Sequence, residues 1–283
     1  MLKKTSLASV VTIAGTDPSG GAGIQADIKA ISATGAYAAS IITVLVAQNT
    51  CQVTAIEEIP LSFIQQQIDA VFSDLRIGAV KLGMLYQEEI IHLTLTNLKK
   101  YQPPFTVLDP VMIAQTGHLL LKPQAINALV NDLFPIATLI TPNIPEAETI
   151  LKSSINDFNS LREAAITLAT QYKVSVLLKG GHLKSIDSPD IFYDYPKQQV
   201  HCFNTPRINT PNTHGTGCTL SSAIASYLAQ GEDLYHAIVK AKHYLSHAIV
   251  AAKNLKLGRG NGPVHHFYFL HQEKISPLNE TNF

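Results

Sequence analysis

Two glycine-rich segments contain the residues of this chain that are best suited to chemistry. The first is Gly15-Thr-Asp-Pro-Ser-Gly-Gly-Ala-Gly23, and the second is Thr213-His-Gly-Thr-Gly-Cys218, which leads into a predicted helix. Glycines let the backbone approach a phosphate closely, and the N–H groups and dipole of a helix start attract anions. The second segment therefore predicts an anion site, and the same helix start is expected to lower the pKa of the Cys218 thiol.

Both segments also have simpler interpretations, a strand-to-helix turn for the first and a helix start with a buried thiol for the second. The residues 21–26, GAGIQA, fit the glycine part of a dinucleotide fingerprint, which also needs an acidic residue about 20 residues later. No Asp or Glu occurs between Asp27 and Glu57, so a Rossmann site is disfavoured. A P-loop is excluded because no Gly-Lys-Ser/Thr follows the glycines.

Asp27 lies on the same face of a predicted helix as Ile24, Ile28 and Ile31. A carboxylate on an apolar face needs partners, because burying an unpaired charge is costly. Two interpretations follow, a contact with a ligand, which we favour, and a structural hydrogen bond.

Two further motifs follow predicted strands and also have two interpretations each. Asn143-Ile-Pro-Glu146 fits a helix capping box, and the same side chains suit a phosphate-bound Mg²⁺ that is held through water. Lys179-Gly180-Gly181 brings a cation and open backbone to a nucleotide phosphate, or is a polar loop. His243 and His247 are four residues apart on a predicted helix, but Tyr244 stands where a zinc protease needs Glu.

The elements that position these motifs alternate between strand and helix. Apolar β-branched runs predict strands at 9–16, 40–47, 78–82, 106–109, 137–141 and 174–178, with a hairpin over 191–208. Helical periodicity predicts helices near 24–35, 62–72, 86–99, 123–132, 145–151, 160–171, 217–229 and 233–254. This alternation indicates an α/β fold with a parallel sheet covered on both faces, whose ligands gather at the carboxyl ends of the strands.

Composition limits the classes of protein. The 283 residues are 46% hydrophobic with a formal net charge of zero, which argues against a disordered chain and against nucleic-acid partners. The longest strongly apolar stretch, 36–47, is too short to span a membrane. Three cysteines without a CxxC pair, and no recognisable signal peptide, predict a cytoplasmic protein. No linker or repeat interrupts the chain, so one domain is expected over 1–283, with a peripheral tail after about residue 272.

Seven segments in order, TIAGTDPSGGAGIQADIKA, LVAQNT, KLGML, TPNIPEAE, LLKGGH, NTHGTGCTLSSAIA and GPVHHF, closely resemble the hydroxymethylpyrimidine/phosphomethylpyrimidine kinases of thiamine biosynthesis. The resemblance runs from about Ser9 to Phe267. It implies a ribokinase-like three-layer α/β/α sandwich with a mostly parallel central sheet and no large lid. It also implies a small-molecule pyrimidine substrate, ATP with Mg²⁺, and a homodimer. The hydroxymethyl group of 4-amino-5-hydroxymethyl-2-methylpyrimidine would be phosphorylated first, and the monophosphate would then become the diphosphate.

The resemblance also implies roles for individual residues. The pyrimidine pocket would be lined by Gly15, Asp27, Gln48, Met84, Val111 and Cys218. The backbone of Gly215, Thr216 and Gly217 would form the anion hole. His214 is a candidate for a residue that supports this loop without contacting the ligand. Asp109 and Glu146, with Asn143, would organise Mg²⁺ and its waters, and Lys179, Gly180 and Thr213 would reach the nucleotide. Cys218 stands where related sugar kinases carry an aspartate general base, so it acts as a base or as a wall of the pocket.

Three competing functions stay open at this point. A pyridoxine/pyridoxal kinase would use the same fold on a similar ring alcohol, and Gln48 with the GTGC loop favours pyrimidine instead. Covalent chemistry at Cys218 would need a histidine to orient it. A nucleotide- or pyrimidine-binding regulator would turn nothing over, and it would have no need of an anion hole.

Overall fold

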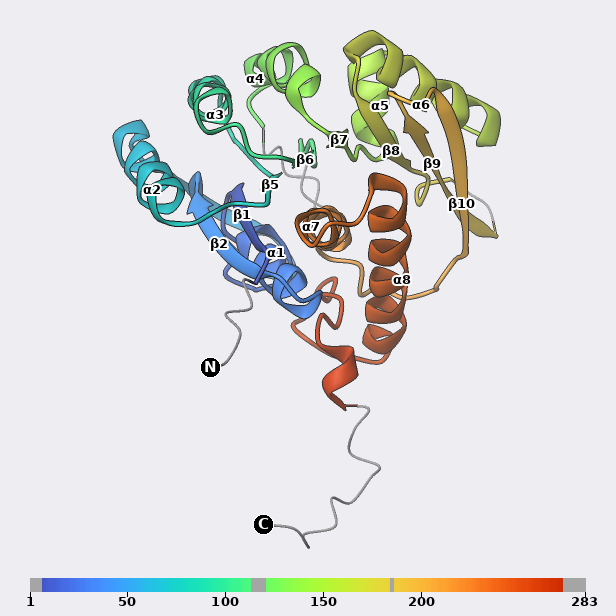
Figure 1. Ribbon diagram of the computed structural model, residues 1–283. Coiled ribbons are helices and arrows are strands. Elements are labelled where there is room, and N and C mark those ends of the chain that lie inside the picture. The colour runs from blue at the N-terminus through green and yellow to red at the C-terminus, as the bar shows by residue number, and fades with distance from the viewer. Residues whose placement is uncertain (1–6, 113–120, 184–185, 272–283) are drawn as a thin grey trace, which may run out of the picture.

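The computed structural model describes residues 7–112, 121–183 and 186–271, and these form a layered α/β structure (Figure 1). Its central sheet has eight strands in the order β10-β9-β8-β7-β6-β5-β1-β2. The strands from β2 to β8 in this sheet run parallel, while β9 is antiparallel to both β8 and β10. The predicted α/β fold with a mostly parallel sheet is confirmed. The peripheral tail expected after about residue 272 lies outside the described residues.

The strands and helices follow one another much as the hydrophobic pattern predicts. The strands are β1 (Ser9–Ala14), β2 (Tyr37–Ile42), β3 (Val44–Gln48), β4 (Val53–Glu58), β5 (Ala79–Leu82), β6 (Thr106–Leu108), β7 (Leu139–Ile140), β8 (Ser175–Lys179), β9 (Asp187–Asp194) and β10 (Gln199–Pro206). The α-helices are α1 (Gly23–Ala33), α2 (Leu61–Asp74), α3 (Glu88–Tyr101), α4 (Pro123–Ala128), α5 (Ile144–Leu151), α6 (Phe158–Tyr172), α7 (Thr216–Ala229) and α8 (Leu234–Ala252).

Helices cover both faces of the sheet because its strands bury side chains in both directions. Along β5, Val80 and Leu82 join the core under α2 to α6, while Ala79 points to the core under α1, α7 and α8. The same alternation separates Leu108 from Val107 in β6. A parallel sheet buried on both faces reads as a continuous apolar run, which is why the strands were predictable. Figure 1 shows the two helical layers on either side of the sheet.

The single strand predicted over 40–47 is wrong. The chain forms β2 in the central sheet and then turns into β3, which pairs with β4 in a separate two-stranded antiparallel sheet. Thr43 lies at the junction, where its hydroxyl donates to the Met84 carbonyl at 2.8 Å. An apolar run cannot show by itself where a strand leaves one sheet for another.

The helix predicted over 123–132 also differs from the structure. It ends as an α-helix at Ala128 and continues as a π-helical turn over Leu129–Leu133 and a 3₁₀ turn over Phe134–Ile136. The other predicted helices are present. Among residues 7–112, 121–183 and 186–271, none of the helices has the length and apolar character needed to cross a membrane.

Candidate active site

An ion pair with a buried carboxylate stands at the carboxyl edge of the sheet, where β6 and β8 end. Lys179 Nζ lies 2.9 Å from Asp109 Oδ1, and that oxygen also accepts the Thr141 hydroxyl at 3.0 Å. The second oxygen, Oδ2, faces the start of α7: a Cβ built on Gly217 would lie 3.2 Å from it and 3.2 Å from Lys179 Nζ. The pair predicted to serve a metal ion and a nucleotide therefore meets directly in front of the predicted anion hole.

Glu146 provides a second carboxylate beside this pair. Its side chain accepts the Asn143 N–H at 2.8 Å while the Glu146 N–H donates to Asn143 Oδ1 at 2.9 Å, which is the predicted capping box at the start of α5. Burial raises the pKa of Glu146 to about 7, and the nearby Lys179 opposes this rise while Asp109 adds to it. Burial would lower the pKa of Lys179, but Asp109 and Glu146 raise it, so the ammonium stays charged.

The start of α7 lies against the first glycine-rich segment, and this contact requires glycine at position 215. Gly215, the residue that caps α7, has a φ of 77°, in the left-handed region. A Cβ on Gly215 would lie 1.7 Å from the Gly21 carbonyl oxygen. The first N–H groups of a helix have no acceptor within it, although the Thr216 N–H makes a 3.3 Å bond to the Thr213 carbonyl. The other expected donors of the anion hole, Gly215 and Gly217, stand at this helix start.

An apolar cluster adjoins Gly15 of the first glycine-rich segment and brings together several of the predicted pocket residues. Met84 packs with Val44 and Val46 of β3, and Val111 packs against them. A Cβ on Gly15 would lie 2.3 Å from Met84 Cε, so this glycine makes room for the methionine. Gln48 lies on the same face of β3 as the two valines, four residues beyond Val44, and is partly exposed.

Cys218 lies in the first turn of α7, as expected, but its pKa does not follow the prediction. Burial raises the pKa of the Cys218 thiol to about 12, and the carboxylates of Asp27 and Asp109 add to this rise. Lys81 and the backbone of Gly23 pull the other way and do not overcome burial. The lowered pKa expected from the helix start is therefore wrong for the unliganded protein, because removal from water outweighs the helix dipole.

The contacts of Asp27 agree with the second interpretation of this residue, a structural hydrogen bond within the protein. Its carboxylate is fully buried and forms an ion pair with Lys81, whose Nζ lies 2.8 and 2.9 Å from the two oxygens. The hydroxyls of Thr12 and Ser222 also donate to it, at 2.6 and 2.8 Å. These contacts join β1, α1, β5 and α7, and they do not leave the carboxylate facing a ligand. The signal for this network was Lys81 itself, a charged residue inside an apolar strand.

Sequence reasoning missed the contact between Asp17 and His214. The Asp17 carboxylate is fully buried, and its Oδ2 lies 2.8 Å from His214 Nε2. His214 was expected only to support the second glycine-rich loop, and the structure gives it a partner in the first glycine-rich loop. The signal was an aspartate in the first loop and a histidine in the second, but nothing in their spacing showed that they meet.

Gly180 does not offer open backbone to a nucleotide. It is buried, its N–H donates to Asp190 Oδ1 at 2.9 Å, and a Cβ at this position would lie 1.9 Å from the Pro189 carbonyl oxygen. Its lack of a side chain serves the packing of β8 against β9, and Lys179 is the residue of this motif that reaches the site. Thr213 precedes the anion hole and is partly exposed.

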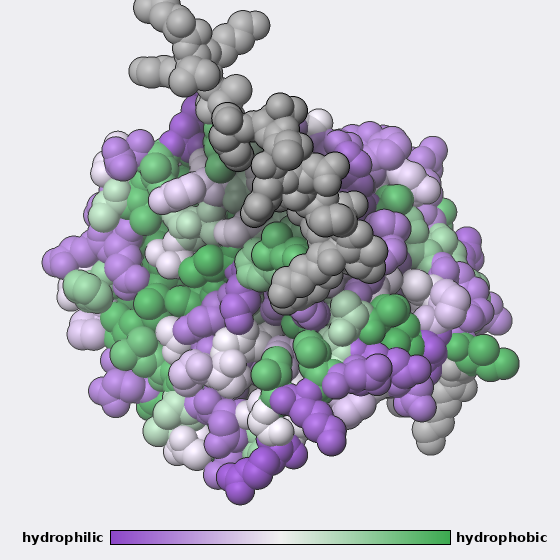
Figure 2. All heavy atoms as spheres, turned by 90° about the horizontal axis from the view of Figure 1, so that it is seen from below, coloured by the Kyte–Doolittle hydropathy of each residue, from purple (hydrophilic) through white to green (hydrophobic). Residues whose placement is uncertain are grey.

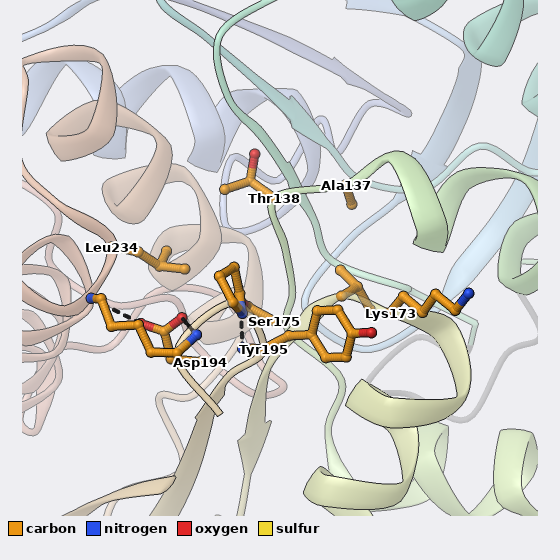
Figure 3. A pocket seen from close by; sticks show the side chains of 10 residues that line it. Ala137, Thr138, Lys173, Ser175, Asp194, Tyr195 and Leu234 are labelled. Carbon is orange, nitrogen blue, oxygen red and sulfur yellow. Dashed lines mark hydrogen bonds and ion pairs between the residues drawn. The ribbon is translucent and has the colours of Figure 1, made fainter. Parts of the chain in front are cut away.

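A hollow of about 340 Å³ lies at the opposite edge of the sheet (Figure 3). Ala137 and Thr138 line it just before β7, and Lys173 and Ser175 line it at the start of β8. These are amino ends of parallel strands, whereas the site described above is at their carboxyl ends, so the hollow is separate from the chemistry. Within the described part of the chain, no three His, Cys, Asp or Glu side chains are grouped so as to hold a metal ion by themselves.

Comparison with known sequences gives consistent matches. The family model for phosphomethylpyrimidine kinase matches residues 17–265. The hydroxymethylpyrimidine/phosphomethylpyrimidine kinase of Salmonella typhimurium is 45% identical over 262 residues, covering 92% of this chain and 97% of that protein. The thiamine biosynthesis bifunctional protein of Geobacter sulfurreducens is 49% identical over 258 residues, covering 91% of this chain. The chain spans only 52% of that longer protein.

Solved structures that share this fold include kinases with two different activities. The phosphomethylpyrimidine kinase of Clostridium difficile is 44% identical with a TM-score of 0.75, covering 85% of this chain and 99% of that one. An ADP complex of Bacillus subtilis pyridoxal kinase has the higher TM-score, 0.86, at 33% identity, covering 94% of this chain and 99% of that one. The two measures rank these structures in opposite order. We give more weight to identity, because fold similarity does not separate activities that share a fold.

Proposed function

The chain belongs to the phosphomethylpyrimidine kinase family, and on that premise we propose that it phosphorylates hydroxymethylpyrimidine and then its monophosphate, with ATP as donor. It is a phosphotransferase of thiamine biosynthesis. The observation that carries this proposal is the meeting of Lys179 and Asp109 in front of the start of α7. The apolar cluster around Met84 offers side chains that suit an aromatic ring. A cation, a carboxylate and helix N–H groups at one place suit phosphoryl transfer.

Catalysis at this site rests on positioning and charge. The transferred phosphoryl group has little covalent chemistry for the protein to perform, and its charge is spread over three oxygens. The N–H groups of Gly215, Thr216 and Gly217 would donate to those oxygens, and Lys179 would neutralise charge that develops towards ADP. Cys218, with its thiol protonated, would serve as a wall of the pocket rather than as the base that removes the alcohol proton.

The residues present fit Mg²⁺ as the companion of ATP. Magnesium is commonly bound by one or two carboxylates, and the nucleotide phosphates and water complete its shell. Asp109 and Glu146 are two such carboxylates near Lys179, and the Asn143 N–H donates to Glu146. When bound, the ion would neutralise phosphate charge.

The substrate ring would lie against the apolar cluster. Met84 and Val111 would contact its faces, and Gly15 leaves space beside Met84. The Gln48 amide has a donor and an acceptor in one plane, which suits a ring nitrogen next to an exocyclic amine. Asp27 has no direct contact with the ring in this proposal, because its carboxylate is buried against Lys81.

A pyridoxine or pyridoxal kinase is the second candidate, because the B. subtilis pyridoxal kinase has the TM-score of 0.86. Both substrates present a hydroxymethyl group on a six-membered nitrogen ring. A protein with one pocket for such rings can accept both, so the two candidates differ in preference.

A homodimer is proposed as the working assembly. Among the residues that the structure describes, no further strand pairs with the outer edges of the two-stranded sheet, and Leu45 on β3 is 45% exposed. Tyr37 and Phe63 nearby in sequence are also exposed. Figure 2 shows apolar side chains gathered in its left half, the side on which β2 and α1 lie in Figure 1. Light scattering on the purified protein at micromolar concentration would distinguish a dimer from a monomer.

We extend the proposal to the whole chain and to its location in the cell. One kinase domain over residues 1–283 and a cytoplasmic location stay predictions. The second is supported by three cysteines that form no disulfide, Cys51, Cys202 and Cys218. Reactivity of all three with a thiol reagent in unfolded, unreduced protein from the cytoplasm would test it.

The test is a competition assay. The purified protein is incubated with Mg·ATP and equal amounts of hydroxymethylpyrimidine and pyridoxine, and the products are followed by mass spectrometry. Pyrimidine carrying first one and then two phosphoryl groups is expected. Pyridoxine phosphate as the main product would assign the second candidate. Folded protein that binds ATP and yields no phosphorylated product would refute both and indicate a binding regulator.

A further inference from the structure

We propose that Asp17 and His214 form a positioning pair that holds the anion-hole loop against the substrate side of the site during both phosphoryl transfers. This inference rests on the proposed function and adds a role for two residues outside it. Neither side chain is among the groups assigned above to substrate, nucleotide or metal. They are 197 residues apart in the chain, and each lies within one of the two glycine-rich loops.

Asp17 organises the first loop around its carboxylate. Oδ1 accepts the Ser19 N–H at 2.9 Å and the Ser19 hydroxyl at 2.7 Å, and Oδ2 accepts the Ala22 N–H at 2.7 Å. Ala22 is the residue that caps α1. Burial alone would raise the pKa of Asp17, but its bonds to His214 and Ser19 lower it to about 2. The carboxylate is therefore ionised at neutral pH, and it can only accept hydrogen bonds.

His214 brings the second loop to that carboxylate. Since Asp17 only accepts, the Nε2–H of His214 is the donor in the 2.8 Å contact. The His214 side chain is 13% exposed, and its backbone N–H donates to the Gly262 carbonyl at 3.0 Å. The next residue is Gly215, which caps α7 and begins the proposed anion hole. His214 is therefore the direct neighbour of the backbone that would bind the phosphoryl group.

The backbone between the two loops is shaped for this contact. A Cβ on Gly21 would lie 2.3 Å from His214 Cδ2 and 3.1 Å from Nε2, so any side chain there would push the imidazole away. The first loop is also tied to the substrate side, because the Ile24 N–H donates to the Gly15 carbonyl at 3.0 Å and Gly15 contacts Met84. The pair therefore sets the distance between the ring pocket and the anion hole.

If the pair no longer fixes the distance between the ring pocket and the anion hole, the chemical step should slow more than substrate binding weakens. Misplacement of a catalytic group by about 1 Å can cost about 100-fold in rate. The loop would keep its glycines and its N–H groups, so substrate would still bind. The expected signature is a lower kcat with nearly unchanged KM for the pyrimidine.

The experiment compares four variants with the full-length wild type in the hydroxymethylpyrimidine assay. His214→Ala removes the donor, and His214→Gln keeps an amide N–H at nearly the same reach. Gly21→Ala displaces the imidazole. His236→Ala is the matched control, because His236 forms a similar contact with Asp233 at 2.7 Å on the exposed start of α8, away from the site. Thermal unfolding of each variant reports the folded fraction.

We expect His214→Ala and Gly21→Ala to lower kcat about 10- to 100-fold with little change in KM, and His214→Gln to recover most of the loss. His236→Ala should match the wild type. A folded His214→Ala with wild-type kcat, or a His214→Gln as slow as His214→Ala, would overturn the inference. If His214→Ala does not fold, Asp17→Asn decides by the same kcat criterion. An inactive wild type would refute the proposed function instead.

Discussion

Two lysine–aspartate pairs stand in the same sheet, and they differ in what surrounds them. Lys81 and Asp27 are both fully buried, and two hydroxyls complete the carboxylate's contacts. Lys179 keeps a side-chain exposure of 16%, and its partner Asp109 has one oxygen facing the start of α7. A pair whose contacts are complete holds elements together, whereas a pair with an open side can meet a ligand. Charge alone does not distinguish the two pairs.

Removal of Asp27 should have the largest effect on stability. Asp27→Ala leaves the Lys81 ammonium buried without a counterion, and breaking a buried pair in this way costs about 3–5 kcal/mol. The free energy of unfolding from urea denaturation measures this loss. Asp69→Ala is the control, because Asp69 pairs with Lys100 on the exposed side of α2 and α3 and should change stability little. A loss no larger than that of the control would contradict the structural role.

Removal of the Lys179 charge should have the largest effect on turnover. Lys179→Met takes away the cation that faces the anion hole, and loss of one such transition-state contact costs about 10²–10³-fold in kcat. Steady-state kinetics on both pyrimidine substrates, with circular dichroism to confirm folding, would measure it. Lys100→Met, at an exposed pair, should leave kcat unchanged. A Lys179→Met variant that retains wild-type kcat would remove the basis for the proposed site.

The sequence predicted where the residues of the Lys179–Asp109 pair lie, but it did not predict the partner of Asp27. Apolar runs and polar strand ends placed Asp109, Asn143 and Lys179 at one edge of the sheet, because parallel strands end together. The same pattern could not reveal that Asp27 is neutralised by Lys81, a residue 54 positions away. It also missed the second sheet and the contact of Asp17 with His214, since both depend on where distant segments meet.

Glu146, near the Lys179–Asp109 pair, makes the stability of the protein depend on pH. Its pKa in the folded, unliganded protein is about 7, above the ordinary 4.5, because burial disfavours the charged form. The folded state holds the proton more tightly than the unfolded chain does. The group's contribution to stability is therefore full below about pH 4.5 and fades as the pH rises to about 7.

Glu146→Gln tests this contribution, because glutamine keeps an oxygen that can accept the Asn143 N–H. The variant should lose less stability than the wild type as the pH rises from 4.5 to 7, in urea denaturation without nucleotide or Mg²⁺. Parallel stability curves for the two proteins would show that Glu146 is not the group responsible.

Cys218 should show the smallest effect. A thiol whose pKa is about 12 is protonated at neutral pH, so it contributes no base to the reaction. General-base catalysis is commonly worth about 10²–10⁴-fold, and Cys218→Ala should cost less than about tenfold in kcat. A loss of a hundredfold or more, with a changed pH–rate profile, would return the thiol to the role of base.

The most direct test measures stability and turnover together on Asp27→Asn and Asp109→Asn. Both changes replace a carboxylate by an amide of the same size, each in one of the two lysine–aspartate pairs. Asp27→Asn should lower the free energy of unfolding and keep most of the kcat per folded molecule. Asp109→Asn should lose most of its kcat and keep its stability. Folded Asp27→Asn without turnover, together with an active Asp109→Asn, would contradict the assignment of a structural role to Lys81–Asp27 and a chemical role to Lys179–Asp109.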